Sequence, residues 1–130
     1  MHNQHSATII SEIISTLQDK AKLVREIEDR AQEALEKDEP VNQYNDILFE
    51  KAELLHQLPD FVSSQIENLP EDLQNELQTR LERFASSAEQ AMEVNSPFFM
   101  KMLLYPEDYQ EGKNNDLEEL IQYLVQLQNQ

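Results

Sequence analysis

The 130-residue sequence contains no cysteine, no tryptophan and a single glycine, Gly112. Without cysteine the chain has no disulfide framework, no thiolate metal site and no cysteine nucleophile. With one glycine it cannot build a glycine-rich phosphate-binding loop of the Walker or dinucleotide type. No apolar run approaches the roughly 18 residues of a membrane span. No lysine or arginine precedes Lys20, so no secretory signal is expected. We therefore expect a cytoplasmic protein.

Basic residues are also scarce in this sequence. Ten Lys and Arg stand against 26 Asp and Glu, and the formal net charge is −16. Such a surface repels the phosphates of nucleic acids and the headgroups of anionic membranes. It suits a basic partner, or it keeps the protein soluble. The composition therefore predicts no nucleic-acid or membrane binding and leaves a protein partner or self-association as the expected interactions.

Apolar residues recur every seven positions through the first half of the chain, which predicts long packed helices. A first helix is expected over 6–37 and a second over 40–69. Pro59 lies inside the second register and should kink that helix or divide it, because it removes a backbone donor. The short turn at 38–40 makes the two helices antiparallel neighbours. The two apolar stripes that define them are Ile10, Leu17, Val24, Ala31 and Leu35, and then Val41, Leu48, Leu55, Val62 and Leu69.

Three further helices are predicted in the second half, and the last of them has a distinct start signal. Asp116 is expected to cap it, with Glu119 three residues on as in a capping box. The predicted order is an amphipathic helix to about Val94, an aromatic helix over 96–106, a loop over 107–115 and a C-terminal helix over 116–128.

The predicted fold is thus all-α and forms a single domain over residues 1–130. A long antiparallel helical hairpin is extended to a three- or four-helix bundle, whose core comprises residues 6–95. The short aromatic helix and the C-terminal amphipathic helix complete it. Helical bundles of this kind bury one apolar stripe per helix.

Histidines are the only candidates for catalytic or metal chemistry. Glu53 and His56 form an E-x-x-H pair, which supplies two metal ligands in carboxylate bundles. The sequence has no second such pair, so an exposed structural His56 is the favoured interpretation. A phosphotransfer bundle would use His56 as a phosphoryl acceptor, but Asp60 would repel the phosphate. His2 and His5 bind metal weakly at best. We expect no enzymatic activity, no metal and no cofactor.

Residues 96–109, SPFFMKMLLYPEDY, gather four of the nine aromatic residues and two of the four methionines. The spacing of Phe98, Met102 and Tyr105 fits one helix face that covers the open end of the hairpin. The consecutive apolar pairs in this stretch cannot all face one way, so some must meet the C-terminal helix, a second subunit or a foreign peptide. The predicted partner-binding residues are Phe98, Phe99, Met102, Leu103, Tyr105, Leu120, Leu124 and Leu127.

Several features occur in a characteristic order along the first three helices. They are Glu28 and Ala34-Leu35 late in the first helix, the polar turn 36–39, Lys51 before Leu54-Leu55, and the segment Met92-Glu93-Val94-Asn95. This order, over residues 7–95, resembles the FlgN-type flagellar export chaperones, which are small acidic helical proteins of the bacterial cytoplasm. The resemblance implies that the protein holds the C-terminal amphipathic segment of a hook–filament junction subunit before export.

The same resemblance implies a mode of recognition, and an alternative function remains beside it. Helix-in-groove binding would use the apolar face of residues 117–127, or the groove which that face covers. The alternative is a structural all-α homodimer without a client. Its subunits would meet through helix 116–127 and through Phe99 or Leu103.

Overall fold

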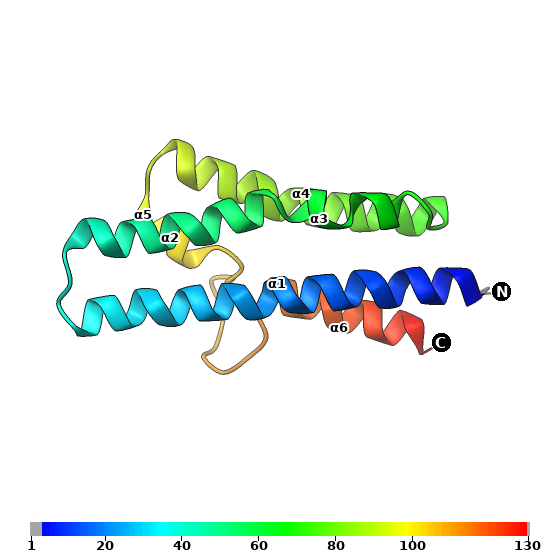
Figure 1. Cartoon of the computed structure of the whole chain (residues 1–130), viewed down its shortest axis with the longest axis horizontal. Helices are drawn as coiled ribbons and strands as arrows, with labels where there is room; N and C mark the ends of the chain where they lie inside the picture. The colour runs from blue at the N-terminus through cyan, green and yellow to red at the C-terminus, as the bar shows by residue number, and fades with distance from the viewer. Residues whose placement is uncertain (1–3, 130) are drawn as a thin grey trace.

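The structure, a computed structural model, describes residues 4–129 and confirms the all-α prediction. That range contains helices, turns and one long loop, and no strand. Helix α1 and the pair α2 and α3 form the antiparallel hairpin, α4 runs back along α2 and α3, and α6 lies along α1 (Figure 1). The helices are α1 (Gln4–Glu36), α2 (Val41–His56), α3 (Leu58–Ile66), α4 (Glu71–Glu93), α5 (Pro97–Met102) and α6 (Asp116–Gln128). None of these helices is both long and apolar enough to cross a membrane.

The seven-residue apolar stripes form the core of the bundle. In α1 the series from Ile10 to Ala31 is buried, and in α2 and α3 the series is buried from Leu48 onward. The prediction is wrong for Leu35 and Val41, which are exposed. Both residues lie at the tip of the hairpin, which extends beyond the end of α4 (Figure 1), so no third helix covers them.

Pro59 divides the second predicted helix rather than kinking it. Helix α2 ends at His56 and α3 begins at Leu58, with Pro59 in its first turn, where the missing N–H removes no intrahelical bond. The two helices continue in nearly the same direction and both pack on α4 (Figure 1). The apolar register therefore survives the break.

Two helices end in left-handed residues other than glycine. Asp38 after α1 has φ 56° and Asn95 after α4 has φ 50°. In each case the following amide donates to a carbonyl five residues back, from Glu39 to Ala34 and from Ser96 to Ala91. This is the Schellman arrangement, which Asp and Asn tolerate better than other non-glycine residues. The short turns of the bundle are thus possible in a chain with one glycine.

Helix α5 is shorter than the predicted helix 96–106, because the chain turns sharply after Met102. Leu104 has φ 76°, a conformation that is rare for a bulky residue. Its side chain is buried, and its carbonyl accepts a hydrogen bond of 2.9 Å from the Asp116 amide. These two interactions hold the loop 103–115 against the start of α6.

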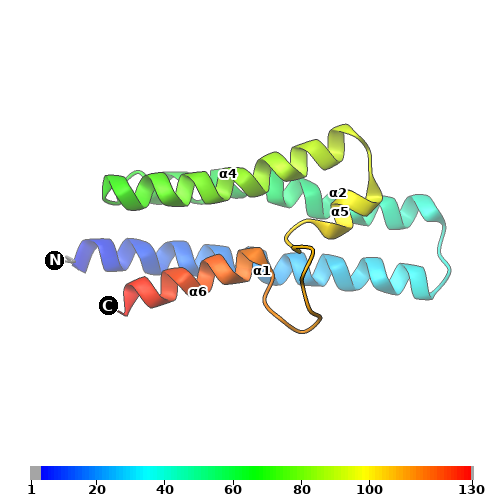
Figure 2. The same cartoon turned by 180° about the vertical axis from the view of Figure 1, so that it is seen from behind.

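The last two helices cover different halves of the bundle. Helix α5 packs on α2 and α4, whereas α6 packs on α1. The loop between them crosses near the middle of α1 and projects beyond it (Figure 2). The predicted cap of α6 is displaced by one residue: Asn115 caps the helix and Glu118 completes the capping box. The pairs Asn115–Glu118 and Asp116–Glu119 have the same spacing, so the sequence allows either as the capping box. In the structure Asn115 is buried at the start of the helix and acts as the cap.

Candidate protein-binding site

Helix α5 presents its largest side chains to solvent. Ser96 caps the helix by accepting a hydrogen bond from the Phe99 amide, and Pro97 occupies its first turn. This start directs Met100 into the core and leaves Phe98 65% and Phe99 55% exposed. Their rings lie 5.9 Å apart, and Met102, one turn further on, is also exposed. We call Phe98, Phe99 and Met102 the α5 patch.

The predicted partner-binding residues fall into an exposed and a buried group. The α5 patch is exposed and Tyr105 is half-buried. Leu103, directly after α5, is buried, and Leu120 and Leu124 are fully buried in α6, which packs on α1. Leu127 is half-buried near the end of α6. The structure therefore does not bring the eight residues together on one surface, and α6 packs in cis.

A fully buried lysine lies beneath the α5 region. The Lys51 ammonium donates to the Lys101 carbonyl of α5 at 2.8 Å. It also faces Glu28 Oε2 at 2.9 Å as an ion pair without an aligned hydrogen bond. Tyr105 donates its hydroxyl proton to the other Glu28 oxygen at 2.6 Å. Lys51 thus connects α2 with α1, α5 and the loop.

An arginine extends this network to α6. Arg25 of α1 donates two hydrogen bonds to the Glu118 carboxylate, at 2.6 and 3.0 Å, and one to the Tyr105 hydroxyl at 3.1 Å. Glu118 in turn accepts a hydrogen bond from the Asn115 amide. Bidentate arginine–carboxylate pairs are directional as well as charged. We refer to Arg25, Glu28, Lys51, Tyr105 and Glu118 as the Lys51 network.

Burial and pairing perturb the titration of this network in different directions. Burial lowers the pKa of Lys51, and Glu28 opposes that shift. The hydrogen bonds from Arg25 lower the pKa of Glu118. Burial, with the hydrogen bond to Glu28, raises the pKa of Tyr105. The network is partly buried, and its hydrogen bonds hold the loop 103–115 and α6 on the hairpin.

A pocket of about 410 Å³ opens beside the network, between α1, α2 and the loop. This volume lies in the range of ligand-binding clefts. Tyr105 and Tyr109 line it, and their rings meet edge to face with centroids 4.6 Å apart. Tyr44 and Leu48 of α2 also line it. We call this cleft the tyrosine pocket.

The tyrosine pocket is continuous with the α5 patch. Met102 belongs to both, since it lines the pocket and is exposed. Phe98 and Phe99 precede Met102 by four and three residues, which places them on the same side of the short helix. An apolar surface therefore leads from α5 into an aromatic cleft.

The histidine hypotheses gain nothing from the structure. His56 is exposed on α2, and its Nε2 lies 4.0 Å from the Glu89 carboxylate. Among the side chains that the structure describes, those of residues 6–129, no group of three potential metal-binding residues is found. His2 lies outside the described residues, as does the side chain of His5. His56 is thus positioned as the exposed helix residue that the sequence favours.

Of the residues in the Lys51 network and the tyrosine pocket, sequence reasoning assigned only Met102 and Tyr105 to a site, and Lys51 and Tyr44 show why the others were missed. Lys51 follows Leu48 by three residues and precedes Leu55 by four, so the apolar spacing itself placed it on the buried face. Its counter-charge could not be located, because Glu28 lies on another helix. Tyr44 gave no local signal, since its role depends on a loop more than fifty residues away.

Comparison with known proteins provides no independent guide to this site: no protein-family model matches the chain, and no match was found among curated proteins or solved structures.

Proposed function

We propose that the protein is a non-enzymatic helical module that binds another protein through the α5 patch. The exposure of Phe98 and Phe99 carries the proposal. Two neighbouring phenylalanines lie more than half exposed on a chain that otherwise buries an extensive aliphatic core. Exposed aromatic residues of this size are enriched where protein interfaces form, and an adjacent methionine adapts to varied partners.

The expected occupant is an apolar or amphipathic segment of a different protein rather than a second copy of the chain. Each copy carries a formal net charge of −16, so a homodimer would bring two strongly acidic surfaces together. A foreign segment with apolar and basic residues would meet no such repulsion. Charge complementarity favours correct partners and speeds their association.

An export chaperone is the specific form of this function that we propose, with the amphipathic helix of a secreted subunit as its client. The client would dock on the α5 patch, which is accessible. It would not need to displace α6, whose apolar face is occupied by α1. The acidic surface would keep the complex soluble before export.

The test is affinity capture with the tagged full chain and a surface-disrupting variant. We expect a stoichiometric partner that binds the wild type and is lost with Phe98→Ser/Phe99→Ser. The matched control is Phe49→Ser, which changes another exposed phenylalanine on α2. The partner should then be purified, and in solution it should bind the wild type but not the double variant. Equal capture by wild type and the double variant would contradict the proposal.

Sedimentation of the free protein separates the alternative function from this one. The proposal expects a monomer at micromolar concentration. A dimer that dissociates in Phe98→Ser/Phe99→Ser would instead establish the structural homodimer. A client that is not a secreted subunit would remove the export role while leaving the binding role in place.

A further inference from the structure

The tyrosine pocket combines aromatic walls with a surplus of negative charge. Its rim includes the exposed carboxylates of Glu107 and Glu111. Among the described residues neither carboxylate forms an ion pair or a hydrogen bond. The pocket thus offers two unpaired anionic groups next to tyrosine rings.

The cations near the pocket are largely committed to other groups. Arg25 is held by Glu118 and Tyr105, and Lys51 is held by Glu28 and the Lys101 carbonyl. The pocket lining and the Lys51 network together hold three cations and four carboxylates. The cations are Arg25, Lys51 and Lys101, and the carboxylates are Glu28, Glu107, Glu111 and Glu118. The local balance is therefore negative, as is that of the whole chain.

The aromatic surface available to a ligand comes mainly from Tyr44 and Tyr109. The Tyr105 ring already has two cations near it, with Lys51 Nζ at 5.0 Å and the Arg25 guanidinium carbon at 5.8 Å. Tyr44 is half-buried, and its side chain makes no hydrogen bond or ring contact with another described residue. A tyrosine face attracts a cation that lies within about 6 Å of the ring centre.

We propose that the tyrosine pocket receives a cationic side chain of the partner, an arginine or a lysine, while neighbouring apolar residues of the same segment cover the α5 patch. The cation lies between the Tyr44 and Tyr109 rings and pairs with Glu107 or Glu111. Met102 forms the junction between the two parts of the surface. This inference rests on the proposed function and adds the chemistry of the partner: an apolar segment with one basic anchor.

The pocket can be tested without knowledge of the partner. The probes are N-acetyl-arginine amide and N-acetyl-citrulline amide, which have nearly the same shape but differ in charge. Each is titrated to millimolar concentration into the isotope-labelled full chain while backbone amide resonances are followed. We expect the arginine probe to shift amides of residues 28–32, 44–48 and 101–112, with at least about tenfold weaker binding of the citrulline probe.

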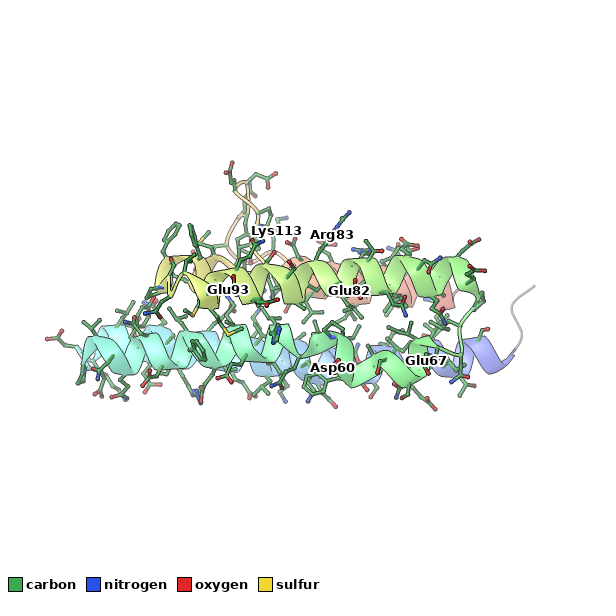
Figure 3. All side chains as sticks on the ribbon, turned by 90° about the horizontal axis from the view of Figure 1, so that it is seen from above. Asp60, Glu67, Glu82, Arg83, Glu93 and Lys113 are labelled. Carbon is green, nitrogen blue, oxygen red and sulfur yellow. The ribbon has the colours of Figure 1, made fainter. Side chains whose placement is uncertain are left out.

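Protein variants separate the pocket from general acidity. Glu107→Gln/Glu111→Gln should weaken binding of the arginine probe about tenfold. Glu67→Gln/Glu82→Gln removes the same charge at two exposed positions, one just after α3 and one on α4, that do not line the pocket (Figure 3), and should leave binding unchanged. Circular dichroism confirms that both variants fold.

Two outcomes would overturn the inference. Equal binding of the two probes would show that charge is not recognised, and the absence of shifts at the pocket would show that no such site exists. Neither outcome bears on the capture experiment with Phe98→Ser/Phe99→Ser, which tests the α5 patch alone. The failure of the anchor pocket is therefore distinguishable from the failure of the proposed function.

Discussion

Lys51 is a charged side chain that the fold buries completely, so its contribution depends on its partners. Removing it takes the nearest cation from the mostly enclosed Glu28 carboxylate, which keeps only the longer contact with Arg25 at 3.9 Å. We expect Lys51→Met to lower the free energy of unfolding by about 3 kcal/mol, because a buried carboxylate that loses its close partner costs more than the intact pair. Urea unfolding followed by circular dichroism measures this change.

The compensating variant distinguishes the charge effect from a packing defect. Lys51→Met/Glu28→Gln removes both charges and keeps an acceptor for the Tyr105 hydroxyl. It should recover at least about 1 kcal/mol relative to Lys51→Met, because the two residues are in contact and do not act additively. A double variant no more stable than the single one would show that Lys51 acts through its volume alone.

Glu118 makes the attachment of α6 sensitive to acid. The hydrogen bonds from Arg25 lower its pKa below the ordinary value of 4.5. A carboxylate with a lowered folded-state pKa stabilises the fold above its unfolded value and loses that contribution as the pH falls through the lowered pKa. Wild type should therefore exceed Glu118→Gln in stability at pH 6, and the two should converge toward pH 3.

Urea midpoints measured between pH 3 and pH 7 test this convergence. Glu67→Gln serves as the control, since Glu67 is exposed and pairs with no cation among the described residues. Its difference from wild type should stay small across the range. A wild-type advantage over Glu118→Gln that persists unchanged at pH 3 would contradict the assignment of the Arg25–Glu118 pair as its source.

Helix α6 is part of the core, which separates its role from that of α5. Leu124 is fully buried on the face that packs on α1. Leu124→Ala should lower the free energy of unfolding by about 3 kcal/mol, through lost burial and the cavity left behind. Phe99→Ser, on exposed α5, should change it by less than about 0.5 kcal/mol.

The two variants should have the opposite order of effects on capture of the partner. At a temperature where both variants are folded, Leu124→Ala should retain the partner and Phe99→Ser should weaken its capture. Loss of the partner with Leu124→Ala, in a protein that stays folded, would indicate that α6 itself is the docking element, as the sequence first suggested.

The long helices were predictable because burial imposes a regular spacing on the residues of one face. Ile10 to Ala31 and Leu48 onward follow it and are buried. The end of α5 was not predictable, because it depends on the left-handed conformation of Leu104, which tertiary contacts hold. The exposure of Leu35 and Val41 likewise depends on where the other helices end.

The site was predictable only in part, for a related reason. Phe98 and Phe99 could be singled out because the stretch 96–109 has more apolar residues than one helix face can bury. The α5 patch could not be separated from Leu120 and Leu124 by sequence, because that requires knowing that α6 packs on α1 and α5 on α2 and α4. The tyrosine pocket draws Tyr44 and Tyr109 from segments far apart in sequence, and no local pattern records that meeting.

At the scale of the whole molecule, the dominant electrostatic property is self-repulsion. The formal net charge is −16, and the described residues form few ion pairs that would offset it. The Debye length, over which exposed charges interact, falls from about 30 Å at 0.01 M salt to about 8 Å at 0.15 M. Added salt should therefore stabilise the folded chain, whereas it would weaken a fold held mainly by exposed ion pairs.

We expect the unfolding temperature to rise by about 3–6 °C between 10 and 150 mM sodium chloride, which for a chain of this size reflects roughly 1 kcal/mol. Thermal unfolding followed by circular dichroism measures the rise. Glu67→Gln/Glu82→Gln, with two fewer charges, should start from a higher unfolding temperature at 10 mM and rise less. A flat or falling dependence would mean that paired groups such as Arg25 and Glu118 outweigh the surplus of acids, and that the acidic surface is not a general source of repulsion. Charge repulsion would then not oppose a homodimer either, because the same unscreened acidic surface would have to cause it.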